Sequence, residues 1–365
     1  MSYAYAQSKT PFTCGIDLHA KTLFATVINQ QGKISARKEL PCEKKDVLDF
    51  LMPFKGNLSI GAESTFNWYW LADICKEHQI PFYLGHALYM KHIHGSKQKN
   101  DSLDSRKIGN LLRTGFFPQA YAYPQAMRAV RDLLRHRLRL VRLRSGIHAN
   151  IKNILYQAGV IDFPQTIVAS RKHWPDILKN IADTATSARI TSSLALLDTL
   201  DKQIVIQEKQ AIALAQEQDK PSLTLLKTIP GVGNILAMTM LYETHTTERF
   251  KTPARYSSYA RTVKVDHSSA GKITGINNHK IGNPYLAWAF AEVCFQAKKN
   301  NHEIKCYFDS LLTKHSKNNA LSRMRHKFSV AVFYMLKNKV PFDLKRFCHT
   351  DKDDNSTAGL EKTKI

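Results

Sequence analysis

Four carboxylates lie where predicted secondary structure could bring them together. Asp101 and Asp104 are three residues apart at the start of a predicted helix, so their Cβ atoms should lie about 5–6 Å apart on one face. Asp17 and Glu63 each end a predicted strand, and ligands of open α/β sheets gather beyond strand ends. Hard divalent cations take oxygen ligands, and a pair of them can activate an oxygen that attacks a phosphodiester and stabilise the oxygen that leaves it. The acids together predict a Mg²⁺ site, with Mn²⁺ as the alternative ion.

Each of these acids also has an ordinary structural interpretation. Asp101 and Asp104 form a good helix-start signal, with a capping aspartate followed by an acid that the helix dipole favours. Asp17 could begin a turn after its strand, and Glu63 could be an edge acid. Their order is more specific than any one of them, because a strand-end Asp and a strand-end Glu precede D-x-x-D at the start of a helix. We therefore expect the D-x-x-D pair both to begin the helix and to hold metal.

A serine pair supplies a second candidate for phosphodiester chemistry. Ser268 and Ser269 lie in a predicted basic loop before a helix. A serine hydroxyl can attack a phosphodiester if it is activated and the phosphate charge is neutralised. Lys272, Lys280 and His279 are available for neutralisation. The alternative is a solvent-facing loop, since no Ser-His-Asp arrangement can be argued from the spacing.

The elements that must position the acids alternate between strands and helices. Residues 12–40 predict three short strands with a turn at Gly32, and residues 58–64 predict a buried strand. The remaining predicted elements are a helix near 43–54, an amphipathic helix over 66–78, a short strand over 81–86, and a helix from Asp101 to about Leu112 that Gly115 closes. This order indicates an α/β domain over about residues 1–120.

Two long helices are predicted in the middle of the chain. Residues 125–157 contain no Pro and a single Gly, and their apolar residues have helical spacing. In 190–217 apolar residues recur every seven, at Leu197, Ile204 and Ala211. The two helices together predict a coiled-coil arm.

The first of these helices is rich in arginine. Its seven arginines between residues 128 and 144 are opposed within that segment by Asp132 alone, so the cations would repel one another at i,i+3 and i,i+4 spacing. We favour a phosphate backbone as their partner over a solvated helix face. The predicted nucleic-acid-binding residues are Arg131, Arg135, Arg139, Arg142, Lys272 and Lys280.

A third, helical region is expected from about residue 220. The segment 228-TIPGVGNILA-237 resembles the hairpin of a helix-hairpin-helix, whose glycines let backbone N–H groups approach a phosphate; an ordinary interhelical turn is the alternative. An interruption near 264–284 and an amphipathic helix near 284–299 follow. The polar tail over 350–365 is predicted to be disordered.

The composition favours a polyanionic partner. The 365 residues contain 53 Lys plus Arg against 30 Asp plus Glu, a net charge of +23, and nucleic acid is the commonest polyanion. A merely basic protein is the alternative. Six scattered cysteines without a C-x-x-C pair fit neither a zinc site nor a disulfide scaffold. Cys14 and Cys75 are predicted to be buried free thiols in a reducing cytoplasm, and neither a signal peptide nor a membrane-spanning run is expected.

The order of the motifs resembles the DEDD transposases of bacterial insertion sequences, which are relatives of the Piv-type DNA invertases. The N-terminal motifs are G-I-D at 15–17, E-S-T-F-N-W-Y-W-L-A-D at 63–73 and K-N-D-S-L-D-S at 99–105. The C-terminal motifs are L-x-x-I-P-G-V-G at 226–233, R-F-K-T-P-A-R-Y-S-S-Y-A at 249–260, and S-A-G-K…N-H-K-I-G-N-P-Y-L at 269–286. The family often has K-T-D-x-x-D-A, where this chain has Asn100 for Thr and Ser105 for Ala. Ala270 stands where the family often has Gly or Asn.

The resemblance implies a RuvC-like, RNase H-type N-terminal domain joined by a coiled coil to a smaller helical domain. It implies that a serine of the second domain attacks DNA and becomes covalently linked to it. Ser269 matches that position best, with Ser268 as the adjacent alternative. The catalytic metal ligands that the resemblance implies are Asp17, Glu63, Asp101 and Asp104. It also implies a homodimer or homotetramer, and a structured non-coding guide RNA for some members.

The expected function is that of a DNA transposase or site-specific recombinase of an insertion sequence, acting in a bacterial cytoplasm at the nucleoid. The alternatives are a RuvC-like metal-dependent junction nuclease without a covalent serine step, and a non-catalytic nucleic-acid-binding relic. The expected parts are a RuvC-like DEDD domain over 1–122, a helical coiled-coil arm over 123–219, a C-terminal transposase domain over 220–348 and a disordered tail over 349–365.

Overall fold

The computed structural model of the protein describes residues 5–93, 100–161, 163, 174–263, 266–269, 272–276 and 281–349. The chain divides into two compact units, residues 1–126 and 127–365. The first unit contains the four candidate carboxylates, and the second contains the arm and the serine pair. The tail over 350–365, which the sequence predicts to be disordered, lies outside the described residues. The finer division into four parts stays a prediction.

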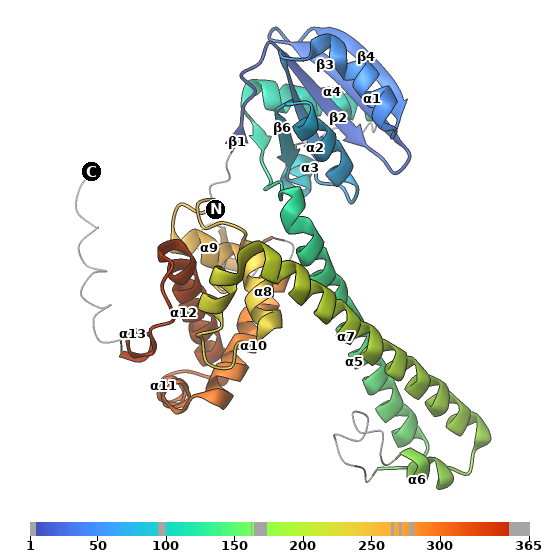
Figure 1. Ribbon diagram of the computed structural model, residues 1–365, viewed down its shortest axis with the longest axis vertical. Helices are drawn as coiled ribbons and strands as arrows, with labels where there is room; N and C mark the ends of the chain where they lie inside the picture. Colours follow the sequence, from blue (N-terminus) through green and yellow to red (C-terminus); the bar gives the residue numbers. More distant parts are fainter. Residues whose placement is uncertain are drawn as a thin grey trace. The chain divides into compact units, whose positions relative to one another are not determined.

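A five-stranded mixed sheet forms the centre of the first unit (Figure 1). Its order is β4-β3-β2-β5-β6, in which β2, β3 and β4 form the predicted antiparallel meander and β5 and β6 run parallel to β2. A two-stranded sheet of β1 and β7 accompanies it. The strands are β1 (Tyr5–Ala6), β2 (Phe12–Leu18), β3 (Thr22–Asn29), β4 (Ile34–Pro41), β5 (Leu58–Glu63), β6 (Phe82–Gly85) and β7 (Phe117–Pro118).

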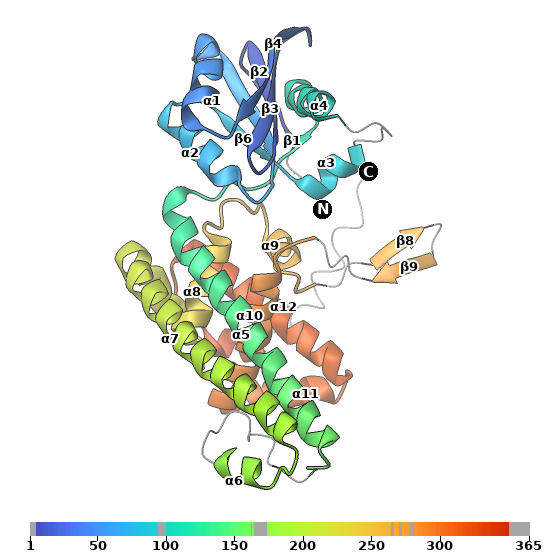
Figure 2. The ribbon, with the colours of Figure 1, turned by 90° about the vertical axis from the view of Figure 1, so that its right-hand side faces the viewer.

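Helices cover both faces of the central sheet (Figure 2). α1 (Lys44–Leu51) and α2 (Trp68–Glu77) share a core with apolar residues of β2, β3 and β5 on one face. α4 (Asp101–Thr114) packs on the other face, where Ile108 and Leu112 belong to a separate core. The 3₁₀ helix over Met52–Phe54 and α3 (Ala87–Ile93) complete the unit. This arrangement is compatible with the predicted α/β RNase H-like domain.

Two long helices of the second unit run side by side in both views (Figures 1 and 2). They are α5 (Gln125–Gln157) and α7 (Thr184–Leu226), with the short α6 (Trp174–Lys179) at their far end. Ile190, Leu197, Ile204 and Ala211 are all buried, so the predicted seven-residue period of α7 is that of its buried face. The pair is a helical arm, and its supercoiling stays a prediction.

The rest of the second unit is a helical bundle with one hairpin. Its core includes the fully buried rings of Tyr242, Tyr256, Phe290 and Phe333. The predicted interruption near 264–284 contains two paired strands rather than only a loop. The elements are α8 (Asn234–Thr244), α9 (Pro253–Tyr259), β8 (Asp266–Ser269), β9 (Lys272–Ile276), α10 (Pro284–Asn300), α11 (His302–Leu312), α12 (Lys317–Asn338) and α13 (Leu344–His349).

Two expectations from the sequence concern the free cysteines and membrane-spanning helices. Cys14 and Cys75 are buried and free, as predicted. Burial raises the pKa of the Cys75 thiol to about 12 and also raises the pKa of Cys14, so neither is a reactive thiolate near neutral pH. Within the part of the chain that the structure describes, every helix is too short or too polar to cross a bilayer.

Candidate functional site

Asp17 and Glu63 lie at the same level on neighbouring parallel strands. β2 and β5 pair in the register Gly15 with Gly61 and Ile16 with Ala62, so the next two positions along the strands are Asp17 and Glu63. Ile16 and Ala62 belong to the core beneath α1 and α2. Because side chains alternate along a strand, the two acids belong to the opposite face, which α4 covers. The structure therefore places two predicted ligands on one side of the sheet.

Glycines let α4 approach that face at backbone distance. A Cβ on Gly15 would overlap the carbonyl oxygen of Ser105 and the nitrogen of Gly109. A Cβ on Gly109 would lie 3.1 Å from the nitrogen of Gly15. The buried hydroxyls of Thr26 and Ser105 also meet, at 2.7 Å. Ser105, which departs from the common family pattern, thus has a polar partner on β3.

The first residue of α4 is Asp101, and its N-cap is Asn100 rather than an aspartate. The Asn100 side chain accepts a hydrogen bond from the Ser102 N–H at 3.0 Å. Asn and Thr are both good N-cap residues, so the departure from Thr at this position keeps the capping chemistry. Asp101 and Asp104 lie in the first turn without serving as the N-cap. The predicted capping aspartate is therefore replaced by its neighbour, which leaves both carboxylates for other contacts.

Three side chains converge at this edge of the sheet: Asp17, His19 and Asp101. The Nε2 atom of His19 lies 3.5 Å from Asp17 Oδ2 and 3.3 Å from Asp101 Oδ2. Each of the three offers a ligand atom, and these atoms all lie within 4.8 Å of one another. Two carboxylates and an imidazole suit a divalent cation, and the carboxylate oxygens suit Mg²⁺ and Mn²⁺. His19 was missed in the sequence, although it lies two residues beyond Asp17.

The other two predicted ligands lie near this group with different surroundings. Glu63 is half-buried at the end of β5. Asp104 is 22% exposed, and its Oδ1 accepts a hydrogen bond from Lys107 Nζ at 3.1 Å. Among the described residues, neither is in the group whose ligand atoms lie within 4.8 Å. The structure thus brings Asp17 and Asp101 together and keeps Asp104 paired with a lysine.

Asn67 connects the loop after β5 to the turn after β2. Its Nδ2 donates to the carbonyl oxygen of His19 at 2.7 Å, and its Oδ1 accepts from the Thr65 hydroxyl at 3.1 Å. Both residues belong to the motif that begins at Glu63. This part of the motif therefore fixes the backbone that carries His19.

Ser268 and Ser269 are the last two residues of β8. In the hairpin register Ser268 is opposite Ile273, and Ser269 is opposite Lys272, the first residue of β9. Lys280 and His279 lie outside the described residues. The serines belong to the second compact unit and the acids to the first.

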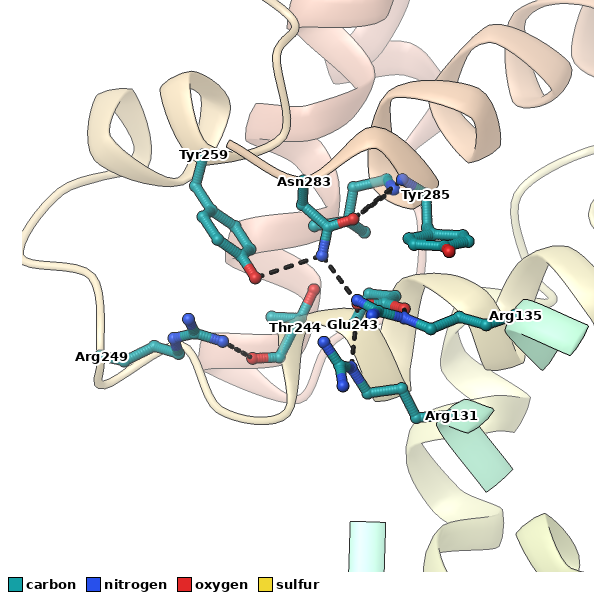
Figure 3. Close-up of polar contacts among 9 residues, drawn as sticks. Arg131, Arg135, Glu243, Thr244, Arg249, Tyr259, Asn283 and Tyr285 are labelled. Atoms are coloured by element: carbon teal, nitrogen blue, oxygen red, sulfur yellow. Dashed lines mark hydrogen bonds and ion pairs between the residues drawn. The ribbon is translucent and has the colours of Figure 1, made fainter. Parts of the chain in front are cut away.

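Two of the candidate arginines contact a buried carboxylate of the second unit (Figure 3). Glu243 is 2% exposed. It accepts from Arg131 Nε at 3.1 Å and from Arg135 Nε at 2.6 Å. Burial alone would raise the pKa of Glu243, but the hydrogen bond from Arg135 and the charges of both arginines outweigh it and lower the pKa below its ordinary value. Glu243 is therefore ionised and neutralises charge at the base of the arm.

Asn283 extends this network to α10. Its Nδ2 donates to Glu243 at 2.7 Å and to the Tyr259 hydroxyl at 3.1 Å, while its Oδ1 caps α10 by accepting from the N–H groups of Tyr285 and Leu286. Figure 3 shows Asn283 between Tyr259 and Glu243. The network joins α5, α8, α9 and α10, and the sequence pattern did not reveal it.

Other arginines of α5 have acidic partners on α7. Arg137 pairs with Glu208 at 2.7 Å, and Arg144 pairs with Asp201 at 2.9 Å. These acids lie outside the arginine-rich segment, 71 and 57 residues away from their partners in the sequence. The later arginine on α5 pairs with the earlier acid on α7, so the two helices are antiparallel.

Arg139 and Arg142 have a different environment. Both are exposed, and they line a groove with Leu143 of α5 and Leu196 of α7. They lie one helical turn apart, which suits two successive contacts with one polyanion. These two are the α5 candidates that remain accessible to a phosphate backbone.

The glycines of 230-PGVG-233 have separate structural roles. Gly231 has φ +78°, and a Cβ there would lie 2.6 Å from the carbonyl oxygen of Gln296, so packing against α10 requires a glycine. Gly233 is the N-cap of α8 and would meet nothing within 4 Å if it carried a Cβ. The phosphate-binding interpretation therefore rests on Gly233 and the helix start.

Comparison with known families agrees with this architecture. Residues 14–159 match the model of the DEDD Tnp IS110 family, described as "Transposase". Residues 223–309 match the model described as "Transposase IS116/IS110/IS902 family". A search of curated proteins found none that matches the chain. The first match runs from β2 through α5 and the second from the end of α7 into α11. The chain belongs to the IS110-type DEDD transposases.

Proposed function

We propose that this transposase cuts and rejoins DNA strands through its four carboxylates and a serine that forms a covalent DNA intermediate. The observation that carries the proposal is the convergence of Asp17 and Asp101 on His19, within 3.5 Å. It occurs at the edge of the sheet in the unit that matches a DEDD transposase family. Such a grouping of acids would repel itself unless a cation neutralised it.

The residues at this edge fit a divalent cation. Asp17 and Asp101 would hold Mg²⁺, with Glu63 and Asp104 as the further ligands. A bound Mg²⁺ would neutralise charge on a scissile phosphate and polarise it. Lys107, paired with Asp104 at 3.1 Å, supplies a cation beside the same phosphate and balances the carboxylate charge.

Ser269 is the proposed nucleophile, with Ser268 as the alternative. Its hydroxyl loses a proton as its oxygen bonds to phosphorus, the phosphorus–oxygen bond to deoxyribose breaks, and the leaving oxygen takes up a proton. The covalent serine–phosphate ester replaces the broken phosphodiester bond. A hydroxyl of a second DNA strand can therefore attack the phosphorus and release the serine. Ser269 lies at the end of β8, opposite Lys272 in the hairpin register, and this pairing with a cationic residue supports the choice of Ser269.

The proposed partners are DNA, a structured non-coding guide RNA and further copies of this chain, as a homodimer or homotetramer. The net charge of +23 and the exposed Arg139 and Arg142 support a nucleic-acid partner. The family resemblance supports the guide RNA and the relation to Piv-type invertases. We also propose that the protein acts in the bacterial cytoplasm, at the nucleoid.

Trapping of protein–DNA adducts on denaturing gels tests this function. The wild type should form adducts with insertion-sequence ends in Mg²⁺, whereas Asp17→Asn and Ser269→Ala should not. Ser145→Ala, on the exposed face of α5, is the matched control and should behave as the wild type. If Ser269→Ala and Ser268→Ala both still form adducts, the serine assignment is wrong.

A junction nuclease that uses water is the second candidate, because the carboxylate group is built entirely within the first unit. Such an enzyme would cleave branched DNA without any adduct. It would lose cleavage in Asp17→Asn and keep it in Ser269→Ala, so the same variants separate the two functions.

A further inference from the structure

A cavity of about 510 Å³ lies among the last three helices of the chain, away from the serine hairpin in sequence. α11 contributes Tyr307 to its wall, α12 contributes Lys327 and Tyr334, and α13 contributes Arg346 and Phe347. Its volume is in the range of pockets that hold small organic ligands. None of the proposed chemistry uses this cavity.

Aromatic rings form much of the wall. The ring of Phe347 lies 5.3 Å from that of Phe342 and 5.7 Å from that of Tyr307, measured between centroids. Tyr334 and Val340 line the same cavity, and they are 40% and 44% exposed, respectively. A large ring that stays exposed at a cavity gives a flat surface for a second flat ring.

Cations accompany these rings. Lys327 Nζ lies 4.3 Å from the centroid of the Tyr307 ring and donates to its hydroxyl at 3.2 Å. Arg323 and Arg346 are exposed and line the cavity too. Asp343 is the acid of this wall, and its Oδ1 accepts a hydrogen bond from the backbone N–H of Arg346 at 2.9 Å. The cavity therefore carries an excess of positive charge beside aromatic surface.

His326 adds a polar atom to the wall. Its Nδ1 is buried and lacks a hydrogen-bond partner among the described residues, and burial lowers the pKa of the imidazole. A neutral imidazole can pair with either a donor or an acceptor. The wall thus combines a flat apolar surface, anion-binding groups and a neutral hydrogen-bonding group.

We propose that this cavity receives one unpaired base of a nucleic-acid strand. The base stacks on Tyr334, and the flanking phosphates pair with Arg323 and Arg346. Base–aromatic stacking beside a cationic backbone path is the general chemistry of single-strand recognition. The inference rests on the proposed function only in that the protein meets nucleic acid, because the carboxylates and the serine have no part in it. A strand is favoured over an apolar peptide because the exposed charged side chains at the cavity, Arg323, Arg346 and Asp343, carry a net positive charge.

Fluorescence of 2-aminopurine in a thymidylate oligonucleotide tests the site with the full-length protein. Stacking quenches this base, so binding of the wild type should lower its emission. Tyr334→Leu should remove the quenching and weaken binding at least about fivefold. Tyr156→Leu removes a ring of similar exposure, 48%, on α5 and should bind as the wild type.

A second pair of variants distinguishes binding at the cavity from a general effect of positive charge on binding. Arg346→Gln should weaken single-strand binding, whereas Lys345→Gln removes a neighbouring exposed cation of α13 that does not line the cavity. A 5-iodouracil oligonucleotide should crosslink to the peptide that contains Tyr334. Adenosine monophosphate at high concentration should compete with the oligonucleotide, since it offers an aminopurine base and a phosphate.

The outcomes are distinct from those of the adduct assay. If the protein binds the oligonucleotide but Tyr334→Leu and Arg346→Gln match their controls in affinity and quenching, the cavity inference is wrong. If adenosine monophosphate binds and the oligonucleotide does not, the cavity takes free nucleotides and the strand is excluded. Binding with relief of quenching in Tyr334→Leu supports the site even if Ser269→Ala still forms adducts.

Discussion

Gly15 of β2 and Gly109 of α4 meet backbone to backbone. A Cβ on Gly109 would lie 3.1 Å from the nitrogen of Gly15, and a Cβ on Gly15 would overlap both Gly109 and the carbonyl oxygen of Ser105. This contact sets the height at which α4 lies over the sheet. Because Asp17 follows Gly15 by two residues and Asp101 begins α4, it also sets the distance between their carboxylates.

Substitution Gly15→Ala should therefore move α4 away from β2. We expect a loss of about 1–3 kcal/mol in the free energy of unfolding of the first unit, with weaker metal binding. Gly146→Ala is the control, because a Cβ there meets nothing within 4 Å and alanine is the better helix residue. Chemical denaturation measures both. Equal stability of the wild type and Gly15→Ala would mean that β2 and α4 have room for a Cβ at residue 15.

The N-cap of α4 gives a prediction about Asn100. Asn100→Ala should cost about 1 kcal/mol and speed hydrogen exchange of the Ser102 amide, whose N–H donates to Asn100 at 3.0 Å. Asn100→Thr should retain most of the protection, since Thr also caps. Exchange followed by mass spectrometry over residues 100–115 measures this. A threonine variant as unprotected as the alanine variant would show that capping is not the role of this side chain.

The carboxylate group predicts a metal-binding defect that can be measured without turnover. Asp17→Asn and Asp101→Asn should each weaken Mn²⁺ binding at least about tenfold, because even outer-shell changes cost about 10–100-fold at metal sites. Asp49→Asn, on the exposed face of α1, should bind as the wild type. Calorimetric titration with Mn²⁺ and then Mg²⁺ decides. Unchanged affinity in both variants would remove these two acids from the site.

The strands, and the acids at their ends, could be predicted because a strand is recognised from apolar residues that are close together in the sequence. Asp17 and Glu63 ended predicted strands, and both do end or nearly end β2 and β5. The cap was misplaced by one residue, because Asn100 and Asp101 are both suitable cap types and only the backbone decides between them. Glu243 could not be found, since it meets Arg131 across 112 positions of sequence. Charge balance at the arm is a tertiary property.

Glu243 predicts the acid sensitivity of the second unit. Its pKa is lowered below the ordinary value of 4.5 in the folded state, so its stabilising contribution is present above about pH 4.5 and is lost as pH falls through the folded pKa. Glu243→Gln should lower the free energy of unfolding by about 3–5 kcal/mol near neutral pH, because it leaves two arginines without their counter-charge. It should also flatten the decline of stability in acid.

Thermal unfolding followed by circular dichroism from neutral to acid pH measures both effects. Glu217→Gln, an exposed change on α7, is the control and should keep the wild-type profile. A Glu243→Gln variant with wild-type stability and an unchanged acid profile would contradict the ion-pair network.

The exposed arginines of α5 predict a change in salt dependence. Each phosphate contact contributes about 0.9 to the slope of log affinity against log salt for duplex DNA, so Arg139→Gln with Arg142→Gln should reduce the slope by nearly 2. Arg137→Gln removes an arginine that pairs with Glu208 at 2.7 Å and should change the slope little. Fluorescence anisotropy at several salt concentrations measures it. Equal slopes for the double variant and the wild type would exclude these two residues from the DNA contact.

The Glu243 network also limits how the protein can be re-engineered. Arg131 and Arg135 belong to α5, whereas Glu243 belongs to α8 and Asn283 caps α10. Consider a chimera in which only the two long helices are exchanged for those of a relative. The residues at positions 131 and 135 would then come from the relative, whereas Glu243 and Asn283, which contact or neighbour them here, would not. Transplantation of the arm therefore requires the matching segments around Glu243 and Asn283 to travel with it, so the unit of exchange is larger than the helices alone.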